Sequence, residues 1–278
     1  MTSLRETLDA GVREGTGTVG GWCSIPSAFS AELMGRCGFD WVCIDTQHGL
    51  IGYDRLTGMI QGLAITGTPV VVRVPWNQPD HIMKALDAGA QGVIVPMVNS
   101  ADDARRAVEA VRYPPEGTRS WGPIRAALDV PGYAPDIANA RTVVVPMIET
   151  RDGVANMDEI LATPGVDAAY IGPSDLALAH GMTPTLNATD PEHVRLIESI
   201  LDACRRHDVI PGIHTDGIDN TMRWRKMGFR MMTLGSDAVL MRQAASAGVR
   251  VFKGAGTGQD AAAARATTSG SSSSGSNA

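Results

Sequence analysis

Two carboxylates that follow consecutive apolar runs are the side chains best suited to chemistry in this sequence. Glu149 closes one run, and Asp175 follows the next through the turn Gly172-Pro173-Ser174. If the two runs are neighbouring parallel strands, both side chains lie at one edge of the sheet and offer oxygen ligands to a hard divalent cation. Oxygen ligands favour Mg²⁺, Mn²⁺ or Co²⁺ over zinc. The alternative is that each carboxylate caps a helix, but two buried carboxylates repel each other unless a cation lies between them.

A second pair, Asp45 and His48, ends another apolar run. A carboxylate three residues before an imidazole is close enough to hold the ring in one tautomer, which would let the other ring nitrogen act as a base. The pattern is weak by itself, because an Asp that caps a helix can precede a His that has no chemical role.

Arg73 ends a third run, where its side chain would lie near the core of the sheet. The guanidinium stays charged there, so it needs an anionic partner. That partner is either a substrate oxygen or a neighbouring carboxylate such as Asp45, and the sequence leaves both open.

The ends of two further apolar runs bring more polar groups to the same edge of the sheet. Pro173 has no N–H, which leaves the Ser174 and Asp175 amides as donors for a small carboxylate at the start of a helix. His214 ends a seventh run and would bring an imidazole to the same edge of the sheet.

Eight short apolar runs must position these side chains, and helical patterns separate them. The runs cover residues 18–24, 41–45, 69–74, 92–98, 142–149, 168–172, 210–214 and 231–235. Continuous apolar strands are typical of a parallel sheet that is buried on both faces. Eight strand and helix units favour a closed (β/α)8 TIM barrel over an open doubly wound sheet, and in such barrels the site lies at the carboxyl ends of the strands.

Composition narrows the partners and the compartment. The net charge is −6 with both signs interspersed, which offers no basic stripe for nucleic acid and no polybasic membrane anchor. No run approaches the ~20 apolar residues of a membrane span, and the polar first 15 residues lack the apolar core of a signal peptide. Four cysteines without a CxxC pair fit a reducing compartment. We therefore expect a cytoplasmic enzyme.

The chain is expected to form one barrel domain over residues 1–253, followed by a tail. The tail, 254–278, is rich in Gly, Ser and Ala, a composition typical of disorder, although Ala261–Ala266 would extend a helix if a partner packed against it. One connection, 113–140, is rich in Pro and Gly and unusually long, which indicates either a covering loop or an excursion with a functional or assembly role.

Several motifs, in this order, resemble the metal-dependent class II pyruvate aldolases of the HpcH/HpaI type, the family of 4-hydroxy-2-oxoheptanedioate aldolase. The resemblance spans roughly residues 20–245. The motifs that carry it are Gly38-Phe39-Asp40-Trp41, Ile44-Asp45-Thr46-Gln47-His48, Val71-Val72-Arg73, Trp76-Asn77, Val95-Pro96-Met97-Val98, the segment 112–119, Ile148-Glu149-Thr150 and Ile171-Gly172-Pro173-Ser174-Asp175-Leu176.

The resemblance implies a TIM barrel of the phosphoenolpyruvate/pyruvate type. Glu149 and Asp175 would hold a divalent metal, which pyruvate chelates through its carboxylate and keto oxygens. The turn at Gly172 and Pro173, with the Ser174 and Asp175 amides, would bind the pyruvate carboxylate.

The resemblance also assigns the chemistry. Arg73 would stabilise the developing enolate oxygen, and His48, oriented by Asp45, would relay protons. The implied reaction is the reversible retro-aldol cleavage of a 4-hydroxy-2-oxo acid to pyruvate and an aldehyde.

The family further implies a hexamer, a trimer of dimers that exchange their last barrel helix. The segment Ala238–Val251 would then pack on a partner, and Asp87 would lie near a neighbouring active site.

Three residues depart from the family pattern, and all three would line the aldehyde side of the site. Gln47 stands where the family usually has Glu, Trp121 follows Ser120 where small residues are usual, and His214 replaces an aliphatic residue. Alternatives on the same barrel are an oxaloacetate decarboxylase, another C–C lyase or a synthase. A barrel that only senses an oxo acid is the non-catalytic alternative.

Overall fold

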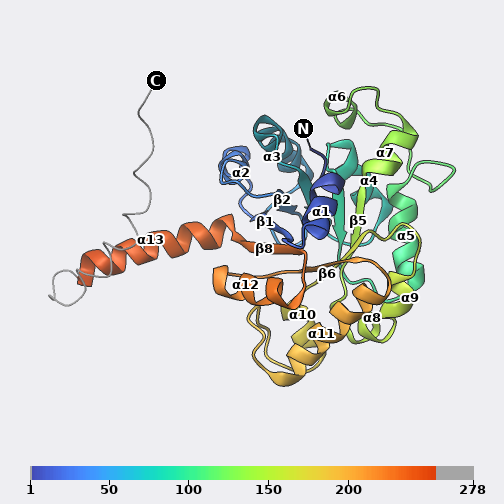
Figure 1. Ribbon diagram of the computed structural model, residues 1–278. Coiled ribbons are helices and arrows are strands. Elements are labelled where there is room, and N and C mark those ends of the chain that lie inside the picture. Colours follow the sequence, from blue (N-terminus) through green and yellow to red (C-terminus); the bar gives the residue numbers. More distant parts are fainter. Residues whose placement is uncertain (1, 255–278) are drawn as a thin grey trace. The chain divides into compact units, whose positions relative to one another are not determined.

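The computed structural model describes residues 2–254 and confirms the predicted (β/α)8 barrel, with each of the eight apolar runs forming a strand (Figure 1). The strands are β1 (Thr18–Cys23), β2 (Trp41–Asp45), β3 (Val70–Arg73), β4 (Gly92–Val95), β5 (Val143–Pro146), β6 (Ala168–Ile171), β7 (Ile210–Ile213) and β8 (Met231–Ser236).

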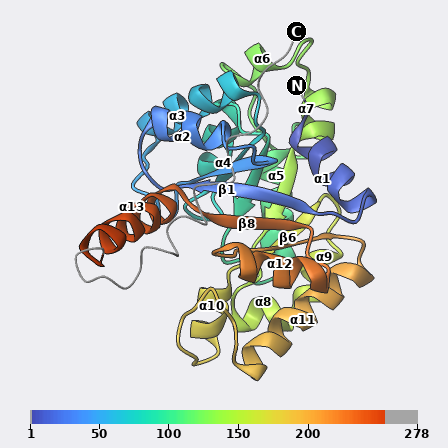
Figure 2. The same cartoon turned by 60° about the vertical axis from the view of Figure 1, so that its left-hand side comes forward.

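All strand pairs are parallel, in the order β5-β4-β3-β2-β1-β8-β7-β6. Figure 2 shows β1 and β8, from opposite ends of the sequence, lying next to each other, and their register begins with Thr18 opposite Met231. The two ends of the order, β5 and β6, meet through a bridge between Met147 and Tyr170 and through backbone hydrogen bonds. The Ile148 N–H donates to the Tyr170 carbonyl (3.0 Å), and the Asp167 N–H donates to the Val144 carbonyl (3.1 Å). The sheet therefore closes on itself at this seam.

Helices separate the strands and bring each following strand back in the same direction. They are α1 (Leu4–Arg13), α2 (Ala28–Gly35), α3 (Tyr53–Thr66), α4 (Pro79–Asp87), α5 (Ala101–Val111), α6 (Ala126–Asp129), α7 (Pro135–Arg141), α8 (Arg151–Ala155), α9 (Met157–Leu161), α10 (Pro173–Ala179), α11 (Pro191–Arg206), α12 (Ile218–Met227) and α13 (Asp237–Gly254).

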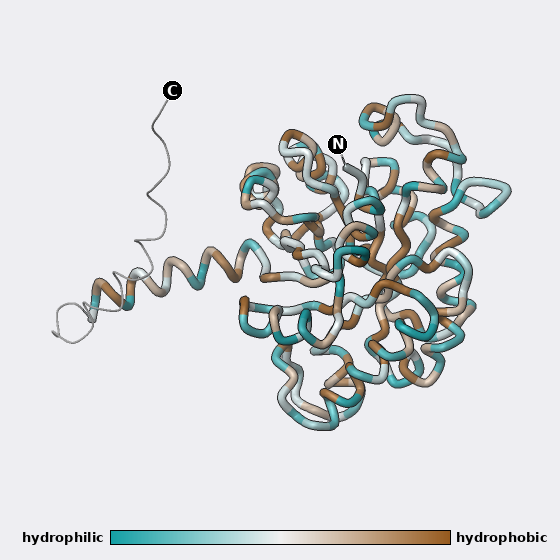
Figure 3. The backbone as a smooth tube through the Cα atoms, viewed as in Figure 1, coloured by the Kyte–Doolittle hydropathy of each residue, from teal (hydrophilic) through white to brown (hydrophobic). Residues whose placement is uncertain are grey.

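The interior of the barrel is filled by strand side chains and by one face of α1. Hydrophobic segments gather on the strands (Figure 3), and β2, β4, β5 and β6 are buried along their whole length. Helix α1 begins with a capping box between Ser3 and Glu6, and its Leu4 and Leu8 belong to the same buried cluster as Trp41 and Val143. Because Trp41 opens β2 and Val143 opens β5, α1 covers the amino-terminal end of the barrel.

The long connection 113–140 lies at this same amino-terminal end. It follows α5, precedes β5 and contains α6 and α7. Its Arg119 and Tyr133 line a cavity together with Val70, which opens β3, and Gln91, which precedes β4. The connection is thus a helix-to-strand link, at the opposite end of the barrel from the strand ends that carry Glu149 and Asp175.

The chain divides into two compact units, the first of which ends at Asp237 and holds the whole barrel. The described part of the second unit, Ala238–Gly254, is helical, so the segment Ala238–Val251 forms a helix. The predicted domain boundary at residue 253 stays a prediction, and Ala261–Ala266 lies outside the described residues. Among residues 2–254, no helix has the length and apolarity needed to cross a membrane.

Removal of the Leu8 side chain tests whether the packing of α1 against the amino-terminal end of the barrel stabilises the fold. Leu8 is 2% exposed, whereas Val12 on the same helix is 42% exposed. We expect Leu8→Ala to lower the free energy of unfolding by about 2–5 kcal/mol, because it leaves a cavity in the core. Val12→Ala should change it by less than about 0.5 kcal/mol. Urea denaturation of both variants measures the difference, and equal effects would contradict this role for α1.

Candidate active site

Glu149 carries a buried carboxylate at the seam where β5 and β6 close the barrel. It lies just beyond β5, is 2% exposed, and accepts a hydrogen bond at Oε1 from the Met97 N–H (3.0 Å). Its Oε2 is buried and has no hydrogen-bond partner among the described residues. Burial raises the pKa of Glu149 to about 7, and the negative charge of Asp175 adds to the increase. The second oxygen is therefore an acceptor that the protein itself leaves unsatisfied.

Gly172 brings the end of β6 against this carboxylate. A Cβ at position 172 would lie 2.2 Å from Glu149 Oε2, so only glycine allows this approach. Helix α10 begins at the next residue, and Asp175 is its third residue. The first-turn amides of Ser174 and Asp175 have no partner four residues back in the helix, as at every helix start. The structure thus places both carboxylates at adjacent strand ends, as the sequence predicts.

Met97, at the end of β4, is a site residue to which the sequence reasoning gave no role. Its φ of 57° lies in the left-handed region, which a non-glycine residue seldom adopts. This conformation accompanies the N–H···Oε1 bond to Glu149. Strained backbone of this kind is often found where a site must be held in place. Met97 belongs to the motif Val95-Pro96-Met97-Val98, but no residue pattern indicates which carboxylate its amide reaches.

Arg73 and Asp45 form a two-pronged ion pair across neighbouring strands. Arg73 Nε donates to Asp45 Oδ1 (2.9 Å) and Arg73 Nη2 donates to Asp45 Oδ2 (2.6 Å). Although burial by itself would raise the pKa of Asp45, the bonds from Arg73 hold that pKa below its usual value. The neighbouring carboxylate is therefore the anionic partner of Arg73, one of the two alternatives left open by the sequence. The Nη1 atom of Arg73 takes no part in these two hydrogen bonds.

His48 stands at the open end of the barrel, and Asp45 fixes its backbone. The Gln47 and His48 N–H groups donate to Asp45 Oδ1 (3.1 and 3.2 Å). In the structure the Asp45 carboxylate thus bonds to the main-chain N–H of His48. From the sequence we expected it to contact the imidazole ring. The His48 side chain is exposed, while Gln47 is partly buried and its Oε1 has no described partner.

Trp22 connects the ion pair to His214 and is the second residue that sequence reasoning missed. Its Nε1–H donates to Asp45 Oδ2 (3.2 Å), and the Arg73 guanidinium lies 5.0 Å from the centroid of its ring. The His214 ring packs edge-on against it at 4.5 Å between centroids. An aromatic residue near the end of the first apolar run was the available signal, but strand residues of this kind are usually core.

His214 is partly exposed and is kept uncharged by its surroundings. Desolvation lowers its pKa to about 4, and the positive charge of Arg73 acts in the same direction. Its Nδ1 lies 3.4 Å from the Thr233 hydroxyl. A neutral imidazole beside Trp22 can donate or accept one hydrogen bond without adding charge to the site.

Trp121 is the one predicted site residue that the structure does not bring to this end of its own barrel. It belongs to the connection between α5 and β5, where its ring packs against Tyr113 and Tyr133 with centroids 5.2 and 5.8 Å apart. Its side chain is half exposed, at 57%. Nearby, Arg119 forms an ion pair with Asp87 (2.7 Å).

The arrangement suits a divalent cation with two protein ligands. No group of three His, Cys, Asp or Glu side chains within residues 2–254 forms a metal cluster. Two carboxylates suffice for a hard cation such as Mg²⁺, because such ions keep several coordination positions for water and substrate. The unsatisfied Oε2 of Glu149 fits this chemistry, since a cation supplies what the protein does not.

The structure is a TIM barrel with acidic residues at two adjacent strand ends, and the ion pair of Arg73 and Asp45 lies at the ends of other strands. Such side chains at the carboxyl ends of the strands are typical of TIM-barrel enzymes, whose active sites lie there. The sequence profile of the HpcH/HpaI aldolase/citrate lyase family matches residues 19–244. The chain is also 35% identical to 4-hydroxy-2-oxo-heptane-1,7-dioate aldolase of Escherichia coli, over 88% of this chain and 94% of that protein. The chain therefore belongs to the HpcH/HpaI family.

Solved structures agree with this assignment. An HpcH/HpaI aldolase/citrate lyase family protein from Burkholderia cenocepacia superposes with a TM-score of 0.83 at 28% identity, covering 90% of this chain and 99% of that chain. The citrate synthase SbnG superposes with a TM-score of 0.80 at 28% identity, covering 92% and 99%. The family resemblance drawn from the motifs is confirmed.

The uncharged state of His214 predicts a pH dependence of stability. Its pKa in the folded protein, about 4, lies below the value of 6.5 expected in the unfolded chain. Below pH 6.5 the unfolded state binds a proton that the folded state excludes, so stability falls as the pH drops towards 4. We expect this fall to be larger in the wild type than in His214→Gln by up to about 3 kcal/mol. Urea denaturation from pH 7 to pH 4 measures it, and parallel pH profiles would contradict the assignment.

Proposed function

We propose that the protein is a metal-dependent pyruvate aldolase that cleaves a 4-hydroxy-2-oxo acid to pyruvate and an aldehyde, and that also catalyses the reverse addition. The observation that carries the proposal is the buried Glu149 oxygen without a partner, held against Gly172 and next to the charge of Asp175. Membership of the HpcH/HpaI family, and relatives named as aldolases, support the same activity.

Glu149 and Asp175 are proposed to hold the metal, which is Mg²⁺, Mn²⁺ or Co²⁺. When bound, such a cation polarises the 2-oxo group and lowers the energy of the enolate that forms on C–C cleavage. The oxygen-only donor set supports a hard cation. The Ser174 and Asp175 amides at the start of α10 are proposed to donate to the substrate carboxylate, with Gly172 and Pro173 shaping the turn.

His48 is proposed to take the proton of the substrate's C4 hydroxyl as the C3–C4 bond breaks. The bond's electron pair passes to C3 and the C2 oxygen, which releases the aldehyde and leaves the enolate of pyruvate, and protonation at C3 completes the product. The exposure of His48 and the anchoring of its backbone by Asp45 support this role. Arg73 stays charged, since its pKa is raised by Asp45 despite burial, and it stabilises negative charge on the enolate oxygen.

The aldehyde side of the site is proposed to include Gln47 and His214, beside Trp22. His214 is neutral and partly exposed, so it can hydrogen-bond to an acceptor oxygen. The Gln47 Oε1 is a buried acceptor without a described partner. These groups give a more polar acceptor side than the aliphatic residue implied by the resemblance at position 214.

We propose that the enzyme is a homo-oligomer, and that Trp121 acts through a second copy. Trp121 and Asp87 belong to one surface at the amino-terminal end of the barrel, where Arg119 pairs with Asp87. The resemblance implies that Asp87 lies near a neighbouring active site in a hexamer. Exposed apolar side chains on α13, among them Met241, Val249 and Phe252, support packing on a partner.

A synthase that adds the same enolate to another acceptor is the second candidate. The superposition on citrate synthase SbnG at 28% identity favours it. Product analysis with pyruvate and candidate aldehydes distinguishes the two, because only the aldolase forms a 4-hydroxy-2-oxo acid.

Exchange of the pyruvate methyl protons tests the enolate chemistry directly. In deuterated water, the protein with Mg²⁺, Mn²⁺ or Co²⁺ should replace these protons, and removal of the metal with EDTA should stop the exchange. Glu149→Gln and Asp175→Asn should each slow it by at least about 100-fold, since each removes a metal ligand. Asp152→Asn, at an exposed carboxylate on α8, serves as the control. Mass spectrometry of the recovered pyruvate measures exchange, and exchange without metal, or none with any metal, would contradict the proposal.

Gly172→Ala tests whether the close approach of β6 holds the metal-binding carboxylate in place. The new methyl group would displace Glu149 Oε2, so we expect the Kd for Mn²⁺ to rise roughly 10- to 100-fold, as for other changes that disturb metal ligands. Gly58→Ala is the matched control, because its Cβ meets only Ala28 at an ordinary 3.8 Å. Isothermal titration calorimetry measures both affinities, and equal Kd values for the two variants would count against this geometry.

A further inference from the structure

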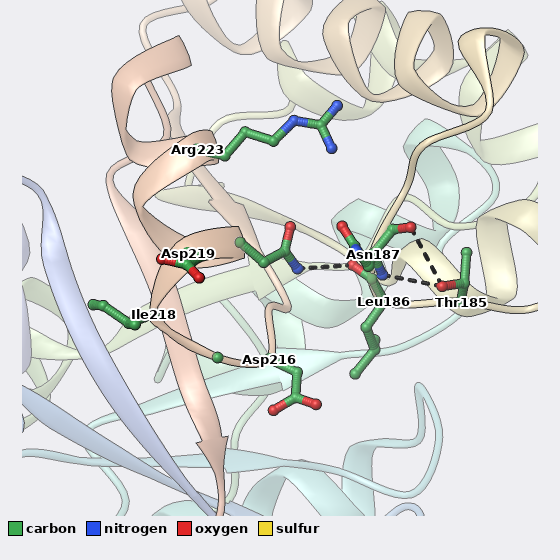
Figure 4. Close-up of a pocket in the computed structure, with 9 residues that line it drawn as sticks. Thr185, Leu186, Asn187, Asp216, Ile218, Asp219 and Arg223 are labelled. Atoms are coloured by element: carbon green, nitrogen blue, oxygen red, sulfur yellow. Dashed lines mark hydrogen bonds between the residues drawn. The ribbon is translucent and has the colours of Figure 1, made fainter. Parts of the chain in front are cut away.

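A cavity of about 680 Å³ lies beyond the carboxyl end of β7, outside the residues described above (Figure 4). One wall is the loop 185–187, which follows α10, and the other is the segment 216–220 at the start of α12, with Arg223 one turn further along. Because segment 216–220 follows the end of β7, this wall of the cavity lies at the same carboxyl end of the strands as Glu149 and Asp175.

The segment that leaves β7 is held by hydrogen bonds and runs from His214 to the wall of this cavity. The Thr215 N–H donates to the Thr233 hydroxyl (2.9 Å), and the Thr215 hydroxyl bonds to Thr221. Gly217 has a φ of 74°, which glycine adopts without strain, and its N–H donates to the Leu234 carbonyl (2.9 Å). His214 on one side of Thr215 packs against Trp22, while Asp216 on the other side lines the cavity.

Two acceptor oxygens in the cavity wall have no partner within the described part of the chain. Asn220 is only 9% exposed, and its amide N–H donates to the Leu186 carbonyl (3.0 Å), which fixes the side chain, but its Oδ1 is unsatisfied. Asp216 Oδ1 is likewise buried and unpaired. Buried acceptors of this kind are costly unless a ligand or water donates to them.

Donors line the same cavity. The N-cap of helix α12 is Gly217, which offers no side-chain acceptor, so the first N–H groups of the helix are free to donate to a ligand or to water. Arg223 donates from Nη1 to the Ala188 carbonyl and packs over the Trp224 ring at 4.6 Å, which holds its guanidinium in place.

The hydrogen-bond acceptors and donors in the cavity wall indicate which class of ligand fits the cavity. Asp216 and Asp219 disfavour an anion, and the positive charge of Arg223 disfavours a metal ion. A chain of hydroxyl groups satisfies both the acceptors and the donors of the cavity wall, because each hydroxyl donates one hydrogen bond and accepts others.

We propose that this cavity binds the hydroxylated chain of the acceptor aldehyde, with Asp216 and Asn220 accepting from its hydroxyl groups. This proposal rests on the proposed aldolase function.

Competition between two four-carbon aldehydes tests the proposal. Pyruvate is added to erythrose, which carries three hydroxyl groups, and to butanal, which carries none, and kcat/KM is measured for each. The wild type should prefer erythrose. Asp216→Ala should lower the ratio of the two values roughly ten- to hundredfold, the loss expected for a hydrogen bond to a charged acceptor. Asp216→Asn keeps an acceptor oxygen and should retain most of the preference. Asp202→Ala, at an exposed residue of α11 paired with Arg205, is the control.

A binding measurement separates failure of this proposal from failure of the proposed function. Saturation-transfer NMR should detect erythritol, which cannot react, on the wild type and on Asp202→Ala, but not on Asp216→Ala. Loss of pyruvate exchange in the wild type would contradict the aldolase function, whereas the erythritol signal reports on the cavity alone. An unchanged erythrose-to-butanal ratio in Asp216→Ala, or erythritol binding that Asp216→Ala leaves intact, would overturn the proposal.

Discussion

The buried carboxylate of Glu149 is the constraint on which the rest of the site depends. It lies where β5 and β6 close the barrel, with one oxygen held by the Met97 amide and the other left without a described partner. Taking a carboxylate out of water raises the free energy of the folded state unless another group offsets the cost. The close approach of Gly172 and the nearby charge of Asp175 increase this cost, and a divalent cation would remove it. The seam that closes the fold is thereby also the place where we propose that the metal binds.

A second network, formed by side chains of β1, β2 and β3, stabilises another part of the carboxyl end of the barrel and carries the positive charge of Arg73. The Arg73 and Asp45 pair joins β3 to β2, and Trp22 on β1 bonds to the same carboxylate. Arg73 also acts at longer range, because its charge lowers the pKa of both Glu149 and His214. The charge of Arg73 thus opposes the rise in the pKa of Glu149 that burial causes, and it adds to the desolvation that keeps the His214 imidazole neutral.

The sequence was sufficient for the fold and for most of the strand ends, because both follow from local patterns. All eight strands coincide with apolar runs, and Glu149, Asp175, Arg73 and Asp45 come together because parallel strands end at one edge. What the patterns could not decide was the choice of partners across strands. Asp45 lies three residues from His48 in sequence, yet its side chain pairs with Arg73, which is brought opposite it only by the strand register. Met97 and Trp22 likewise reach their partners, Glu149 and Asp45, only across strands. Trp121 lies away from these strand ends because its connection follows a helix, and a helix-to-strand link runs at the amino-terminal end of a barrel.

The most direct test of the central claim is a crystal structure of the protein soaked with Mn²⁺ and pyruvate, with anomalous data collected to locate the metal. We expect one anomalous peak within coordination distance of Glu149 Oε2 and of the Asp175 carboxylate, with the pyruvate carboxylate and keto oxygens completing part of the metal's coordination shell. A metal bound elsewhere, or pyruvate bound without contact to a metal at these two carboxylates, would contradict it.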